Sequence, residues 1–183
     1  MGISLSHARY EEIKQIVVDL FVHYDVRCIP VSAFEMAAKM GIPVIPYSAI
    51  PDNKRRLLLR ESEDGFVVEK TAREWYIYYN DQKDYGRVNN TIMHEIGHIV
   101  LDHSEDSELA EKEVKFFAKY ALAPPVLIHK LGIKNAYEVY EHFDVSLEAA
   151  GYAYEYYKKW LAYGKNDYTD YELQLLRLFN EAV

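Results

Sequence analysis

The chain has 183 residues and a net charge of −8; half of its residues are hydrophobic, which suits one globular domain with its own core. The acidic balance argues against a nucleic-acid-binding protein, because such proteins usually carry a basic face. The one cysteine, Cys28, cannot form a disulfide within the chain, no apolar run approaches the ~18 residues of a membrane span, and no secretory signal is recognisable. We therefore expect a cytoplasmic protein with no membrane partner.

The first half of the chain predicts two helices followed by short strands. Apolar residues recur at helical spacing across residues 7–24. Ser32 and Glu35 form a capping box for a second helix, and Gly41 is well placed to end it. Residues 42–47 are β-rich and contain prolines, as in an edge strand. Three further strands are predicted at residues 57–59, 66–68 and 74–80.

The second half of the chain is predicted to be helical. After a polar loop at residues 81–90, helices are expected at about residues 90–102 and 107–122. Breaks are expected at Pro124–Pro125, Gly132 and Gly164, and Thr169 with Glu172 forms a capping box for a final helix. These elements predict an α+β fold with a small, mostly antiparallel sheet and a helical majority. We expect a core at residues 1–125 and a helical region at 126–183 that packs on it as one structural unit.

The strongest chemical signal is the segment His94-Glu95-Ile96-Gly97-His98, an H-E-x-x-H motif. Residues four positions apart lie on the same face of a helix, so the two imidazoles can bind one zinc ion at ~2.0–2.1 Å. Glu95 is rotated off that face, where its carboxylate can act as the catalytic base. The flanking residues are apolar on nearly every side, which predicts a buried helix. Buried histidines need partners, either a metal ion or, as the alternative, backbone carbonyls.

A third ligand is needed, because a catalytic zinc usually has three protein ligands and an open position. We expect it from the helix at residues 107–122. At about 100° per residue, Glu113 falls inside the apolar arc of that helix and Glu111 falls at the edge of the arc. A carboxylate on a buried face needs a compensating cation. The sequence therefore predicts Glu113 as the third ligand and Glu111 as the second choice, with pairing of Glu113 to a basic residue as the alternative.

Two residues just after the motif are weaker candidates for the site. Asp102 follows His98 by four positions and could ligate the metal or orient His98. His103 comes at the helix end, where a cationic histidine interacts favourably with the helix dipole. It is also a candidate for stabilising the transition state.

The motif, followed by Glu-Val-Lys-Phe-Phe-Ala at residues 113–118 and Leu-Ala-Pro at 122–124, resembles the ImmA/IrrE family of metallopeptidases. That family's pattern reads H-E-L-G-H-x-x-L-x-H, then E-A-N-x-F-A, then L-L-M-P. Asn80 at the end of a strand, Arg87 before the motif, and the segment Phe143-Asp144-Val145-Ser146 also agree with it. The resemblance implies a zincin-like fold, zinc ligands at His94, His98 and Glu113, and a catalytic base at Glu95.

The resemblance also implies a function. Members of this family are intracellular bacterial or phage enzymes that cut a helix-turn-helix repressor and so relieve repression in mobile elements or stress responses. We therefore expect a zinc endopeptidase that hydrolyses a peptide bond in such a repressor, although manganese or another divalent ion also suits two histidines and a glutamate. The strand at Trp75–Tyr79 could bind the extended substrate by strand addition.

Two alternatives remain open from the sequence. The first is a non-catalytic regulator that binds or senses through the same metal site. The second is direct DNA binding by the helices of residues 126–160, which could imitate a helix-turn-helix. That region carries about as many acidic as basic side chains, so DNA binding is disfavoured. The sequence gives no indication of oligomeric state.

Overall fold

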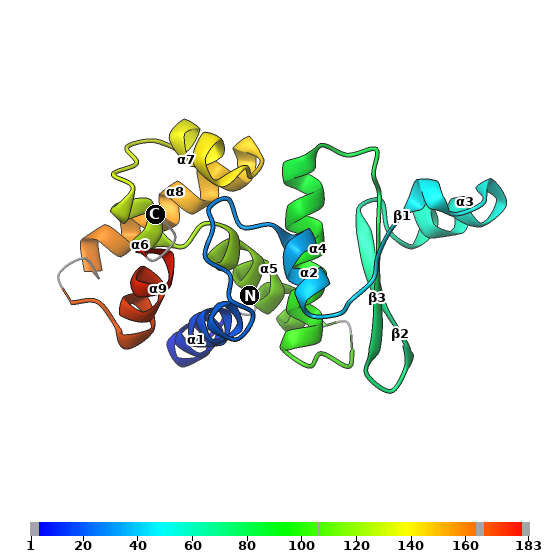
Figure 1. Ribbon diagram of the computed structural model, residues 1–183, viewed down its shortest axis with the longest axis horizontal. Coiled ribbons are helices and arrows are strands. Elements are labelled where there is room, and N and C mark those ends of the chain that lie inside the picture. Colours follow the sequence, from blue (N-terminus) through cyan, green and yellow to red (C-terminus); the bar gives the residue numbers. More distant parts are fainter. Residues whose placement is uncertain (1–3, 106, 164–166, 181–183) are drawn as a thin grey trace.

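The computed structural model describes residues 4–105, 107–163 and 167–180, and it confirms the α+β prediction. Two helices, α4 and α5, run through the middle of the molecule (Figure 1). The sheet and α3 lie on one side of them, and α1 lies with the C-terminal helices on the other (Figure 1). The helices are α1 His7–His23, α2 Ala33–Lys39, α3 Asp52–Glu61, α4 Tyr85–Val100, α5 Glu108–Leu122, α6 Pro125–Lys130, α7 Ala136–Phe143, α8 Leu147–Tyr163 and α9 Asp170–Asn180.

The sheet has three strands in the order β1-β3-β2, namely β1 Val44–Pro46, β2 Gly65–Thr71 and β3 Glu74–Tyr79. Strands β2 and β3 form an antiparallel hairpin, whereas β1 pairs with β3 in parallel, with Val44 opposite Ile77. The prediction of an edge strand within residues 42–47 is confirmed. The sheet is mixed because the parallel pair joins strands that are distant in sequence, which local patterns do not reveal.

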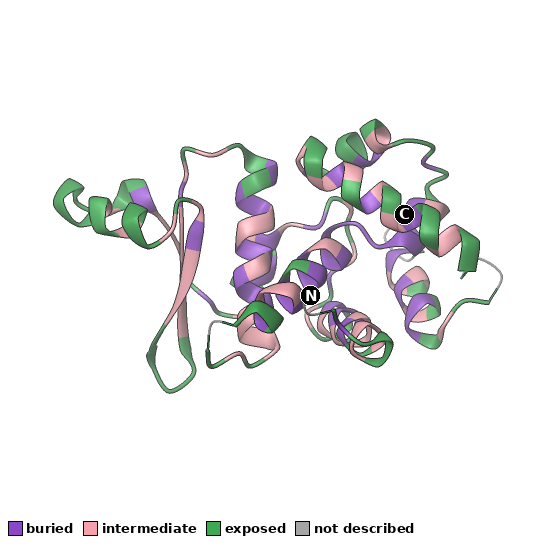
Figure 2. Ribbon diagram, turned by 180° about the vertical axis from the view of Figure 1, so that it is seen from behind, coloured by how far each residue is buried: buried purple, intermediate pink, exposed green. Residues whose placement is uncertain are grey.

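The strand predicted at residues 57–59 is wrong, because these residues belong to α3. Leucine favours helix more than strand, and Asp52 provides a negative charge in the first turn of the helix. The side chain of Arg55 donates hydrogen bonds to the carbonyl groups of Tyr47 and Ile50, which fixes the start of α3 against the preceding chain. No residue of α3 is buried, and the helix projects from the body of the molecule (Figure 2).

The motif helix α4 begins at Tyr85, five residues earlier than predicted. Its N-cap is Asp84, whose side chain accepts a hydrogen bond from the backbone N–H of Arg87. The guanidinium of Arg87 in turn donates to both carboxylate oxygens of Asp64, at 2.7 and 2.8 Å. This bidentate pair ties the start of α4 to the residue that precedes β2.

The C-terminal helices share the buried core with the rest of the chain. The rings of Phe21 in α1 and Phe179 in α9 lie 6.1 Å apart, and the Tyr171 hydroxyl donates to Glu11 at 2.6 Å. The predicted breaks at Pro124–Pro125 and Gly132 are confirmed, and Gly164 lies outside the described residues. The capping box predicted for the last helix is also confirmed by hydrogen bonds in both directions between Thr169 and Glu172. None of the described helices combines the length and apolar character needed to cross a bilayer.

A buried asparagine joins α4 to the start of α2. The side chain of Asn89 accepts a hydrogen bond from the Ala33 N–H at 2.7 Å and donates to the Val31 carbonyl at 3.0 Å. Asn89→Ala should lower the free energy of unfolding by about 2–4 kcal/mol, because it leaves two buried backbone groups without partners. Urea denaturation measures this change. Asn53→Ala, on the exposed face of α3, is the control and should change stability by less than about 0.5 kcal/mol. Equal losses in both variants would contradict the prediction.

Candidate metal centre

Two helices bring His94, His98 and Glu111 together. The histidines lie one turn apart on α4, and Glu111 lies near the start of α5. Glu111 Oε1 is 3.5 Å from His94 Nε2 and 3.3 Å from His98 Nε2. Within the described parts of the chain, these three residues form a group whose ligand atoms all lie within 4.8 Å of one another. Two imidazole nitrogens and a carboxylate oxygen are a donor set of catalytic zinc sites, so these residues fit a divalent metal ion.

The two helices approach closely because Gly97 has no side chain at their contact. A Cβ atom at this position would lie 3.0 Å from Phe117 Cδ1 and 3.3 Å from Val114 Cβ, and both of these α5 side chains are fully buried. Neither could move aside without disturbing the packed core. The glycine inside the motif therefore sets the spacing at which Glu111 can reach the two histidines.

Glu113, the residue that the sequence favoured as third ligand, lies outside this group. Its buried carboxylate accepts hydrogen bonds from Arg9 Nε and Nη2, each at 2.7 Å. Residues 111 and 113 are about 200° apart around a helix, so only one of them can face the motif histidines directly. Glu111 faces them, and Glu113 faces α1. The structure thus brings Glu111, the second choice from the sequence, to the histidines, and it pairs Glu113 with a basic residue, as in the alternative.

The protonation states of these groups suit metal binding. Burial lowers the pKa of His94, which favours the neutral imidazole that coordinates metal ions. Burial opposes the ionisation of Glu111, but the nearby His94 and Lys115 outweigh it, and the pKa of Glu111 lies below its usual value. The hydrogen bonds from Arg9 lower the pKa of Glu113 and keep it ionised at neutral pH.

His103 lies between the motif residue His98 and Glu113. Its Nδ1 lies 3.3 Å from His98 Nδ1, and its Nε2 lies 2.9 Å from Glu113 Oε2. A chain of contacts therefore runs from His98 through His103 and Glu113 to Arg9. Metal-binding histidines are usually oriented by such a contact at the nitrogen that does not bind the metal. Both ring nitrogens of His103 already contact protein groups, one on His98 and one on Glu113. The position of His103 therefore suits orientation of the ligand His98 better than contact with a substrate.

Asp102 is not brought to the ligand group. The helix ends at Val100, and Asp102 adopts the left-handed conformation with φ 55° in the following turn. Its side chain is exposed. The expectation that Asp102 shares a helical face with His98 fails because the backbone is no longer helical there.

Glu95 lies between α4 and the sheet, off the ligand face, as helical rotation requires. Its Oε2 accepts a hydrogen bond from the backbone N–H of Val67 in β2 at 3.1 Å, and the residue is 8% exposed. Burial, together with the charge of Glu95, raises the pKa of the nearby Tyr47 to about 12. Glu95 is thus held at a fixed position next to the histidine pair. Neither Val67 nor Arg9 carries a signal in the sequence that connects it to this site, because both contacts depend on the tertiary fold.

The segment Phe143-Asp144-Val145-Ser146 lies against the start of the motif helix. Phe143 and Val145 are buried, and the Ser146 hydroxyl accepts a hydrogen bond from the N–H of Ala149 at the start of α8. A Cβ atom on Gly86, in the first turn of α4, would lie 2.8 Å from the Ser146 nitrogen. The C-terminal helices are therefore in direct contact with the element that carries the motif.

The comparison with known families agrees with this geometry. The family model of a peptidase family, described as IrrE N-terminal-like domain, matches residues 37–155, well over half of the chain. The match contains the whole sheet, the motif helix and α5. No individual curated protein matches the chain. The chain belongs to the ImmA/IrrE family of metallopeptidases.

Proposed function

We propose that this protein is a zinc endopeptidase that hydrolyses a peptide bond within a protein substrate. The observation that carries the proposal is the convergence of His94 Nε2, His98 Nε2 and Glu111 Oε1 beside the fixed carboxylate of Glu95. A divalent ion held by these three side chains would polarise the scissile carbonyl group and lower the pKa of a water molecule. The two imidazoles favour zinc, and manganese is the second choice.

Glu95 acts as the general base in this proposal. It takes a proton from the attacking water and returns it to the nitrogen of the leaving amine. The hydrogen bond from the Val67 N–H supports this role, because it fixes the orientation of the carboxylate. The base is therefore positioned before a substrate binds, which reduces the cost of reaching the transition state.

The outer edge of β2 is the best place for an extended substrate. Strand β3, where strand addition was expected from the sequence, lies between β1 and β2 and has no open edge. Val67 is opposite Ile77, whose N–H bonds to Pro43 on the β1 side, so the backbone groups of Val67 face away from β3. Among the described strands none pairs with this edge. A substrate strand bound there would lie beside Glu95, which already accepts the hydrogen bond of the Val67 N–H.

The proposed substrate is a helix-turn-helix repressor in the bacterial cytoplasm. The net charge of −8 supports a basic partner of this kind, because opposite charges steer association, and it disfavours direct DNA binding by this chain. The only cysteine in the sequence, Cys28, is exposed as a free thiol, in keeping with a reducing compartment.

Cleavage assays with controlled metal content test the proposal. The substrates are a repressor encoded next to the gene and, independently, a pool of peptides derived from a bacterial proteome. We expect mass spectrometry to show internal cuts with the zinc-loaded protein, no cuts after chelation, and recovery when zinc is restored. Zinc binding without cuts in either substrate would contradict the peptidase and favour a non-catalytic regulator.

A further inference from the structure

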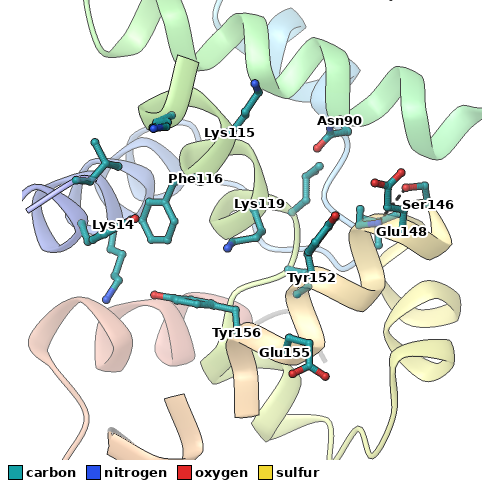
Figure 3. A pocket seen from close by; sticks show the side chains of 18 of the residues that line it. Lys14, Asn90, Lys115, Phe116, Lys119, Ser146, Glu148, Tyr152, Glu155 and Tyr156 are labelled. Carbon is teal, nitrogen blue, oxygen red and sulfur yellow. Dashed lines mark hydrogen bonds between the residues drawn. The ribbon is translucent and has the colours of Figure 1, made fainter. Parts of the chain in front are cut away.

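A cavity of about 1490 Å³ opens between α1, α4, α5 and α8 (Figure 3). It adjoins the metal centre without including the three ligand residues. Asn90 and Thr91 line it one turn before His94, and Lys115 in its wall lies 3.3 Å from the Glu111 carboxylate. The lysines that line the cavity are Lys14, Lys112, Lys115, Lys119 and Lys159.

Most charged groups in the cavity wall already have partners within the protein. Three of the lysines pair with carboxylates, as Lys14 with Glu11, Lys112 with Glu108 and Lys115 with Glu111. Most carboxylates of the wall are similarly engaged, as Asp64 with Arg87, Glu155 with Lys158, and Asp84 as the N-cap of α4. Glu148 has no ion pair with any residue in the described part of the chain. Lys119 and Lys159 have no carboxylate partner among the residues that the structure describes.

Of these two lysines, Lys119 is half-buried and Lys159 is exposed. Its Nζ lies 4.6 Å from the centre of the Tyr156 ring and 5.5 Å from the centre of the Phe116 ring. Burial, with a smaller effect from the charge of Lys159, lowers the pKa of Lys119. The aromatic rings offset part of the desolvation cost but bring no negative charge. The site thus holds a positive charge that nothing in the described protein neutralises.

Other donors lie beside this ammonium group. Lys14, Lys119 and Tyr156 surround the same part of the cavity, and each comes from a different helix (Figure 3). The Lys14 side chain is 14% exposed and is held by Glu11 at 2.6 Å, so it is fixed in place. A ligand entering here would meet ammonium groups and a phenol hydroxyl against aromatic walls. This arrangement suits the oxygen atoms of an anion.

We propose that the cavity binds an anionic group, a carboxylate or a phosphate, through Lys119 with support from Lys159 and Tyr156. Two sources have this chemistry, an acidic side chain of the protein substrate and a small phosphorylated or carboxylated molecule. The first source rests on the proposed peptidase function, because the cavity adjoins the metal centre and would then hold substrate residues near the cut. The second does not depend on that function.

Titration of the zinc-loaded protein with inorganic phosphate at constant ionic strength tests binding directly. We expect shifts in the amide NMR signals of Phe116, Lys119 and Tyr156. Lys119→Met keeps the apolar stem and removes the charge, and it should weaken phosphate binding about tenfold, as expected for loss of a hydrogen bond to a charged group. Lys119→Arg should bind within about threefold of the wild type, because it keeps the charge.

Lys54→Met is the matched control. Lys54 is exposed on α3 and does not line the cavity, yet its replacement removes the same formal charge. It should change the phosphate affinity by less than about twofold. Equal weakening in Lys54→Met and Lys119→Met would overturn the proposal, because the anion would then respond only to net charge. Phosphate shifts spread over the surface lysines would overturn it as well.

A second experiment separates the two sources of the anion. Cut sites in the peptide pool are compared between the wild type and Lys119→Met. Enrichment of aspartate or glutamate near the cut that disappears in the variant assigns the cavity to the substrate. Phosphate binding that depends on Lys119, without such enrichment, assigns the cavity to a small anion. Absence of both effects would overturn the proposal, whereas absence of any cleavage bears on the peptidase function and leaves the phosphate result valid.

Discussion

Glu95→Gln is expected to reduce the rate of peptide cleavage by about 10²–10⁴-fold while leaving zinc affinity unchanged. Glutamine has the shape of glutamate and can still accept the hydrogen bond from the Val67 N–H, but it cannot take a proton from water. Glu95 also lies outside the group of ligand atoms, so its charge is not needed to hold the metal. Single-turnover cleavage rates measure the first effect, and titration of zinc against a competing chelator measures the second.

Glu35→Gln is the control for this experiment. Glu35 is an exposed residue of α2 that pairs with Lys39, and the variant loses the same charge at a distance from the metal centre. Its cleavage rate should match that of the wild type. Full activity in Glu95→Gln would show that another group takes the proton, and loss of zinc from that variant would show that Glu95 helps to hold the metal.

Glu111→Gln and Glu113→Gln should weaken zinc binding by different amounts. If Glu111 is the third ligand, its replacement removes a negatively charged metal ligand, and the affinity for zinc should fall by more than about 100-fold. Glu113 supports His98 only through His103, so its replacement should cost about 10–100-fold, the range for groups that orient a ligand. Chelator competition, with zinc content checked by mass spectrometry of the intact protein, gives both values.

Each of the two glutamate variants is the control for the other. They lie two residues apart on the same helix, and each removes one negative charge, so a general electrostatic effect would be the same in both. A larger loss in Glu113→Gln than in Glu111→Gln would restore the assignment made from the sequence. Thermal unfolding of the metal-free variants shows whether either change acts through the fold.

Local patterns predicted the elements that carry the site. The H-E-x-x-H spacing placed His94 and His98 on one helical face, and the next helix lies where its periodicity indicates. The polar residues before Asn90 resembled a loop, yet they continue the helix because Asp84 caps it. Such caps are difficult to place from sequence when several acidic residues stand close together.

The choice between Glu111 and Glu113 required the tertiary structure. Periodicity identified Glu113 as the carboxylate inside the apolar arc, and the residue is indeed buried. Burial alone does not say which partner a carboxylate has, and for Glu113 the cation is Arg9. Periodicity indicates that a buried acid needs a cation, but it does not distinguish a metal ion from a basic side chain on a distant helix.

The ion pair between Arg9 and Glu113 has a consequence for how the protein folds. It joins residues 104 positions apart, so it closes a long loop and carries a large entropic cost. The motif helix and α5 are neighbours in sequence and can pair early. The orientation of His98 through His103 and Glu113 is complete only when α1 has docked. Tight binding of the proposed metal is therefore expected only after α1 has docked, so that it should be coupled to completion of the core to which α1 contributes Ile13, Val17, Val18 and Phe21.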